Sequence, residues 1–204
     1  FIPVLETQPL KMPRWHDAEL LEQREALTTG LKLLKKYVWT KPANKKPEWK
    51  LLLSQHLHGT YQLYTFAFPE KLIDVTLDSL TSDACCAIHG DPTAANILKD
   101  NIVKHYPRRW RWIDPLDRPY IPNDPHVDLG KMFQSCWGYE RILVDETFKG
   151  NFNYELAFEL TTLTTLNYKR AWLWHIIHLI RLLPYQDRRV RRRFERILSV
   201  HFRP

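Results

Sequence analysis

An aspartate and an asparagine lie five residues apart in the run 88–98, and both side-chain types suit phosphoryl-transfer chemistry. The carboxylate of Asp91 could accept the proton of an attacking hydroxyl. The amide oxygen of Asn96 could ligate magnesium beside the phosphates of a nucleotide. A second metal ligand is available at Asp114, which ends the alternating segment 110–114. The sequence therefore predicts Asp91 as a catalytic base and Asn96 and Asp114 as ligands of Mg²⁺.

Two predicted strands would bring these ligands together. Apolar and alternating residues predict strands over 97–99 and 109–113, with a turn over 100–108 between them. Asn96 and Asp114 then lie at the outer ends of the two strands, which are close in space when the strands pair antiparallel. Ligands eighteen residues apart in the sequence could in this way share one ion.

The same segments resemble the catalytic region of the aminoglycoside phosphotransferase and choline kinase family, which shares the protein-kinase fold. That family typically reads His-Gly-Asp, then Ile-Asp-Pro, then Asp-Leu-Ala or Asp-Leu-Gly; the corresponding residues here are 89–91, 113–115 and 128–130. The resemblance covers residues 88–131. It implies Mg²⁺-assisted transfer of a phosphoryl group from ATP or GTP to a hydroxyl of a small molecule, such as a sugar, an aminoglycoside or an amino alcohol.

Further residues near these motifs are candidates for supporting roles. His89 is expected to hold the catalytic loop through hydrogen bonds. Asp128 is expected to fix that loop by accepting backbone N–H bonds, or to cap the helix that starts there. Three polar residues follow Asp114 closely in the sequence and are candidates for contacts with the acceptor: Asp117, Asp124 and His126.

The expected fold class is α+β and mainly α-helical: the C-terminal lobe of a protein-kinase-like fold, with a small β-hairpin that carries the catalytic loop. At 204 residues the chain is expected to form a single domain. A further short strand is predicted over 85–88. Helices are predicted over 17–38, from 69 onward, and over 129–143 and 186–202, and one or two buried helices over 154–183.

The glycine content indicates which parts of a kinase active site this chain contains. Kinases of this fold cover the nucleotide phosphates with a glycine-rich loop and pair them with a lysine from an N-terminal lobe. The chain has only six glycines, and none of them cluster. We therefore expect the nucleotide-binding lobe to come from another segment or domain, so that these residues alone are an incomplete catalytic unit.

The excess of basic residues is concentrated near the C-terminus. Lysine and arginine number 30 against 23 acidic residues, and arginines dominate the segment 188–196. A nucleic-acid surface is one interpretation. A solvated helix face, with Val190, Phe194 and Ile197 pointing inward, is the favoured one, because a single basic helix is a common false positive.

Other features limit the compartment and the type of metal site. No apolar run reaches the length of a membrane span, and three cysteines, two of them adjacent, form no disulfide framework. The expected location is the cytoplasm. His56 and His58 have a two-residue, strand-like spacing that could chelate a metal, but no third ligand lies within sequence reach.

Two other functional classes remain open besides a kinase. One is a catalytically silent kinase-like module that binds a partner or regulates another domain, and the other is a basic protein that binds nucleic acid. The joint presence of Asp91, Asn96 and Asp114 favours an active enzyme over a silent module.

Overall fold

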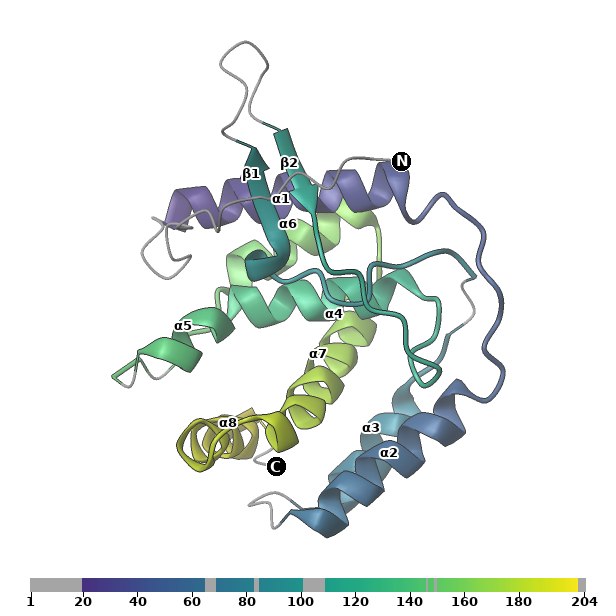
Figure 1. The fold of residues 1–204 in the computed structure, drawn as a ribbon, viewed down its shortest axis with the longest axis vertical. Helices are drawn as coiled ribbons and strands as arrows, with labels where there is room; N and C mark the ends of the chain where they lie inside the picture. Colours follow the sequence, from purple (N-terminus) through teal and green to yellow (C-terminus); the bar gives the residue numbers. More distant parts are fainter. Residues whose placement is uncertain are drawn as a thin grey trace, which may run out of the picture.

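The computed structural model describes residues 20–64, 69–82, 85–100, 109–145, 147–148 and 150–201, and it is mainly helical, as the sequence predicts. Figure 1 shows the helices gathered around α4, with one pair of strands above it. The elements are α1 (Leu20–Tyr37), α2 (Trp49–Leu63), α3 (Lys71–Ser79), β1 (Ile97–Asp100), β2 (Arg109–Trp112), α4 (Pro125–Cys136), α5 (Tyr139–Val144), α6 (Tyr154–Thr164), α7 (Tyr168–Leu182) and α8 (Arg188–His201).

Helix α4 is the centre of the fold. Asp124 caps its N-terminus by accepting a hydrogen bond from the backbone N–H of His126, and proline follows the cap at the first helical position. The helix is buried along most of its length and packs mainly against α7. A Cβ atom added at Gly130 would lie 2.6 Å from the Cβ of Trp174, so glycine is what allows the two helices to approach this closely.

The two strands pair antiparallel, with Ile97 opposite Trp112 in the register. This is the pairing that the sequence predicts, although the residues of the predicted turn over 101–108 lie outside the described ranges. The indole Nε1 of Trp112 donates a hydrogen bond to the carbonyl oxygen of Gly30, 2.8 Å away, which fastens β2 to α1. Helix α1 therefore serves as the support of the strand pair (Figure 1).

Helix α2 was not expected from the sequence, and it changes the interpretation of the two nearby histidines. Because both lie on a helix, residues two apart point in different directions and do not chelate together. His56 stacks on Tyr120 with ring centroids 4.5 Å apart. The two ring nitrogens of His58 instead bond to Glu70 and Asp74 on or beside α3.

Two other predicted elements differ in the structure. The segment 85–88 forms no strand, because its pairing is limited to a single bridge between Cys86 and Pro42. The helix predicted over 129–143 is two helices, since the chain turns at Gly138 with a φ of 73°, a left-handed conformation that ends α4 and starts α5. The first residues of the helix predicted over 17–38 lie outside the described ranges, which begin at residue 20.

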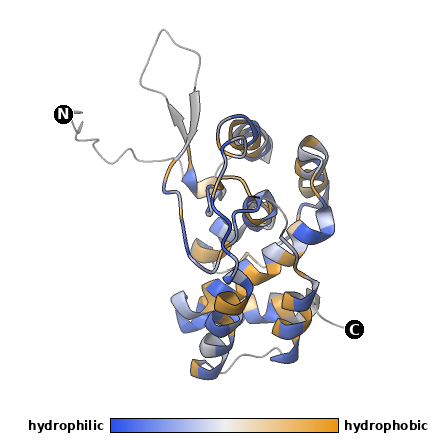
Figure 2. Cartoon of the chain, turned by 90° about the vertical axis from the view of Figure 1, so that its right-hand side faces the viewer, coloured by the Kyte–Doolittle hydropathy of each residue, from blue (hydrophilic) through white to orange (hydrophobic). Residues whose placement is uncertain are grey.

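The basic helix α8 is bound to the body of the fold. Val190 and Phe194 are buried, in agreement with the solvated-face interpretation; the side chain of residue 197 is not described. Arg193 donates hydrogen bonds to the carbonyl oxygens of Ile142 and Asp145, which supports the C-terminal end of α5. Figure 2 shows that the helices carry both apolar and hydrophilic residues, as expected of helices with one face on a core.

None of the helices in the described ranges combines the length and the apolar composition that crossing a bilayer requires.

Candidate active site

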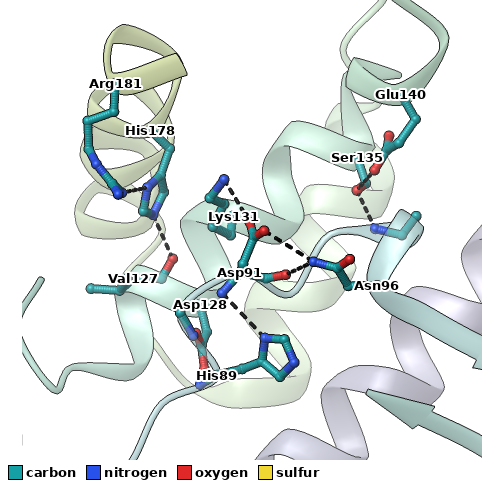
Figure 3. A network of polar contacts seen from close by, with 12 residues as sticks. His89, Asp91, Asn96, Val127, Asp128, Lys131, Ser135, Glu140, His178 and Arg181 are labelled. Carbon is teal, nitrogen blue, oxygen red and sulfur yellow. Dashed lines mark hydrogen bonds and ion pairs between the residues drawn. The ribbon is translucent and has the colours of Figure 1, made fainter. Parts of the chain in front are cut away.

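The loop that carries Asp91 and Asn96 lies along one face of α4. Three polar residues of this helix hold it: Asp128, Lys131 and Ser135. Their spacing of three and then four residues places them on the same side of the helix, one turn after another. Figure 3 shows the three side chains directed at successive positions of the loop. The loop is therefore fixed at its beginning, its middle and its end by a single rigid element.

Asp128 fixes the beginning of the loop. Its Oδ2 accepts the backbone N–H of His89 at 2.9 Å, and its Oδ1 accepts the N–H of Gly90 at 2.7 Å. Oδ2 also accepts the indole N–H of Trp39 at 2.8 Å. Burial raises the pKa of Asp128 to about 6, while the three N–H donors oppose that rise. At neutral pH the carboxylate is ionised and holds the loop as an acceptor.

Replacing this carboxylate should loosen the loop. In Asp128→Asn, one oxygen acceptor becomes an NH₂ donor that faces a backbone N–H. We expect the amide hydrogens of His89 and Gly90 to exchange with solvent about tenfold to a hundredfold faster, since a hydrogen bond to a charged group contributes about 1.5–3 kcal/mol. Hydrogen exchange measured by NMR at pH 7.5 tests this. Unchanged protection of both amides would contradict the anchoring role, and Asp78→Asn, an exposed position on α3, is the control.

The pH dependence of stability provides a second readout for the same variant. The folded-state pKa of Asp128, about 6, lies above the usual value of 3.8, so the folded protein binds this proton more tightly than an unfolded chain does. Its contribution to stability is complete below pH 3.8 and is lost as the pH rises through 6. The asparagine of Asp128→Asn cannot titrate. The difference in unfolding free energy between the wild type and this variant should therefore change between pH 3.8 and about 6 and level off at higher pH.

Ser135 fixes the end of the loop. Its Oγ accepts the backbone N–H of Ala94 at 2.8 Å and donates to Oε1 of Glu140 at 2.6 Å. Burial raises the pKa of Glu140, and the hydrogen bond from Ser135 opposes that rise. The serine hydroxyl therefore acts as a bridge from α5 through α4 to the loop.

The carboxylate of Asp91 lies at the middle of the loop. Its Oδ1 is 2.8 Å from the ammonium of Lys131, and its Oδ2 accepts from Nδ2 of Asn96 at 3.1 Å. The Asp91 side chain is 31% exposed, whereas that of Lys131 is 7% exposed. Oδ1 is itself buried, whereas Oδ2 retains a second acceptor position, and the side chain as a whole is partly open to solvent. It is thus held in place and accessible to a hydroxyl group.

Asn96 is oriented so that its amide oxygen remains available. Its Nδ2 donates to the backbone oxygen of Asp91 at 2.8 Å as well as to the carboxylate, so Nδ2 faces the loop. The backbone oxygen of Asn96 accepts the N–H of Ile113 at 3.0 Å. This bond extends the strand pairing by one step and brings the backbone of Asn96 beside the residue that precedes Asp114.

Asp114 is exposed and has a φ of 54°, in the left-handed region. Such a conformation is unusual for a residue other than glycine, and the following Pro115 further restricts it. Backbone conformations of this kind persist where the surrounding structure imposes them, and they concentrate at functional sites. The carboxylate is also close enough to raise the pKa of His89.

His89 is buried and neutral in character. Its pKa is lowered, chiefly because burial penalises the charged ring, with Asp91 and Asp114 opposing the effect. Nδ1 accepts the backbone N–H of Asp91 at 3.3 Å, and the ring packs 5.2 Å from that of Trp112. These contacts hold the ring of His89 between the loop and β2.

The candidate acceptor residues take different positions. Asp124 is fully buried and accepts both the backbone N–H and the ring Nδ1–H of His126, at 2.9 and 2.7 Å. His126 Nε2 accepts the backbone N–H of Asn167 at 3.1 Å. Both side chains are thus used within the fold, and the structure offers no support for contacts to an acceptor. Asp117 is exposed and pairs with Lys46, and both residues line a cavity of about 420 Å³.

Sequence reasoning did not identify Lys131 or Ser135 as parts of the site. A signal existed in the spacing of Asp128, Lys131 and Ser135, which are polar residues at one helical repeat among apolar neighbours. Arg181 and His178 interrupt the apolar segment 172–183, a pattern that by itself indicates no site. In the structure they lie on α7 near Lys131 (Figure 3).

The donor types present suit magnesium. Among the described residues, no three His, Cys, Asp or Glu side chains form a cluster that could hold an ion by themselves. Asn96 and Asp114 offer an amide oxygen and a carboxylate, both hard oxygen ligands. Mg²⁺ typically uses one or two such protein ligands and completes its shell with water and phosphate oxygens. When bound there, the ion would offset negative charge on the transferring phosphoryl group.

Comparisons with known proteins add no relatives: the sequence matches no protein-family model, no curated protein and no solved structure. The interpretation of this site therefore rests on its residues and their geometry.

Proposed function

We propose that the protein is a phosphotransferase that moves the γ-phosphoryl group of ATP or GTP to a hydroxyl of a small molecule. Asp91 is the general base that accepts the proton of that hydroxyl, and Asn96 and Asp114 hold Mg²⁺ against the nucleotide phosphates. The resemblance of the motifs over 88–131 to the aminoglycoside phosphotransferase and choline kinase family suggests this reaction.

The observation that carries the proposal is the way the loop is held. The loop presents one partly exposed carboxylate, Asp91, and fixes its direction by contacts to Lys131 and Asn96. Preorganised groups of this kind contribute to phosphoryl transfer mainly through positioning and electrostatics. A loop with a purely structural role would not need a carboxylate held at the surface by a buried lysine.

Magnesium-dependent nucleotide binding tests the proposal. In the natural polypeptide that contains these residues, we expect Asp114→Ala to weaken binding of Mg·ATP or Mg·GTP by about tenfold or more, because changes around a metal ligand typically cost at least that much. Titration calorimetry with and without Mg²⁺ measures this. Asp78→Ala, on the exposed face of α3, is the matched control. Binding that is equally strong in Asp114→Ala and the wild type would remove Asp114 from the metal site.

The outcome also separates the proposal from its alternative. A silent kinase-like module could bind a nucleotide or a partner but would transfer no phosphoryl group. Turnover by the wild type, lost in both Asp114→Ala and Asp91→Asn, supports an enzyme. Binding without turnover against neutral, cationic and anionic hydroxyl acceptors supports the silent module.

A further inference from the structure

We propose that the acceptor carries an anionic group, either a phosphate or a carboxylate, and that Arg181 and Lys131 bind this group beside Asp91. The inference rests on the proposed function, because it takes Asp91 as the carboxylate that faces the acceptor hydroxyl. It defines the class of acceptor, which the motifs of the catalytic loop leave open.

Arg181 is a buried cation without an anionic partner in the part of the chain that the structure describes. Its residue is only 9% exposed, and its Nε has no hydrogen-bond partner there. No described Asp or Glu forms an ion pair with it. Its guanidinium lies 5.0 Å from the centre of the Tyr120 ring. Arginines this deeply buried are normally paired, because an unpaired buried charge is costly.

His178 orients the guanidinium of Arg181 through a hydrogen bond. Its Nε2 donates to the carbonyl oxygen of Val127 at 3.1 Å, so its Nδ1 is the acceptor for Nη1 of Arg181 at 3.0 Å. Burial lowers the pKa of His178 well below its usual value, and the positive charges of Lys131 and Arg181 lower it further. The imidazole is therefore neutral and serves as a positioning residue for Arg181.

Lys131 contributes a second buried cation to the same place. Its ammonium lies 2.8 Å from Oδ1 of Asp91, and Figure 3 shows it between this carboxylate and the side chains of α7. Burial lowers the pKa of Lys131, and the charge of Arg181 lowers it further; the charges of Asp91 and Glu140 oppose both effects. The two cations are thus near enough to repel each other. Among the described residues, Asp91 pairs with Lys131, and no carboxylate pairs with Arg181. An anionic ligand would supply the partner that the Arg181 guanidinium lacks.

The position of these groups fits an acceptor rather than a structural ion pair. Asp91 is the most exposed of the three charged side chains, so the cluster meets solvent at the proposed base. An arginine fork pairs well with the two oxygens of a carboxylate or a phosphate. An anionic group held there would direct a hydroxyl of the same molecule toward Asp91.

Binding of acceptor analogues without nucleotide tests the inference. Glucose, glucosamine, glucuronate, glucose 6-phosphate and inorganic phosphate should be titrated into the natural polypeptide in the presence of EDTA, which removes the metal site from the measurement. We expect at least one of the anionic probes to bind about tenfold or more tightly than glucose, and glucosamine to bind no better than glucose. Comparison of glucuronate with glucose 6-phosphate distinguishes the two sources of charge.

Substitutions at Arg181 test whether a preference for anionic probes arises from this arginine. Arg181→Gln should remove the preference for the anionic probe, Arg181→Lys should retain part of it, and Arg141→Gln, an exposed arginine paired with Asp145, should leave it unchanged. An anionic preference that persists in a folded Arg181→Gln variant would overturn the inference. So would a wild-type protein that binds no anionic probe better than glucose, a result that needs no variant.

The two proposals can fail separately. Anion binding without any phosphoryl transfer would uphold the subsite and overturn the proposed function. Efficient transfer to neutral or cationic acceptors, with no anion selectivity, would uphold the function and overturn the subsite.

Discussion

Asp91→Asn is expected to lower kcat by about two to four orders of magnitude, the range for loss of a general base. The amide has the shape of the carboxylate but cannot take the proton of the attacking hydroxyl. Binding of Mg-nucleotide should change little, because in the proposed reaction Asp91 faces the acceptor while Asn96 and Asp114 hold the metal. Steady-state kinetics for each substrate, together with nucleotide titration, measure the two effects separately.

Loss of folding must be excluded as the cause. The substitution leaves the buried ammonium of Lys131 without its carboxylate partner, so the free energy of unfolding should fall as well. A thermal unfolding curve shows whether the variant is still folded at the assay temperature. Asp78→Asn removes an exposed carboxylate on α3 and should retain full turnover. Turnover of Asp91→Asn within a few-fold of the wild type would remove Asp91 from the mechanism.

Gly90→Ala is expected to destabilise the protein and to displace the catalytic loop. Gly90 has a φ of 82°, and a Cβ there would lie 1.8 Å from the carbonyl oxygen of Leu116, a backbone atom that cannot rotate away. The left-handed conformation costs about 1–2 kcal/mol for a residue with a Cβ. The clash also threatens the adjacent hydrogen bond from Leu116 N to His89 O, now 2.7 Å, which contributes about 1 kcal/mol more.

The measured loss should therefore be about 2–3 kcal/mol or more in the free energy of unfolding. Turnover should fall by about a hundredfold in the molecules that stay folded, since a shift of about 1 Å in a catalytic group has that effect. Gly59→Ala is the matched control, because no atom lies within 4 Å of a Cβ added there on α2. That substitution should be neutral or slightly stabilising. Equal stability of Gly90→Ala and Gly59→Ala would show that the loop tolerates a different path.

Local features of the chain were read correctly from the sequence where the signal lay in neighbouring residues. Alternation and apolar runs identified β1 and β2 and their antiparallel pairing, and helical periodicity identified α1, α3 and α8. Helix α2 was missed because its apolar residues are mixed with polar ones on several sides. The segment at 85–88 looked like a strand, yet only Cys86 and Pro42 meet there, so a sheet does not form.

The side chains for the proposed chemistry could be named from the sequence, because Asp91, Asn96 and Asp114 belong to short motifs whose residue types suit proton transfer and magnesium binding. Their surroundings depend on contacts between distant segments, which no local pattern contains. Lys131 meets Asp91 from forty residues away, and Arg181 approaches the same place only because α7 packs on α4. Sequence alone thus determined which groups could act, whereas tertiary packing decided how they are held and which charges surround them, because burial and long-range pairing arise only in the folded chain.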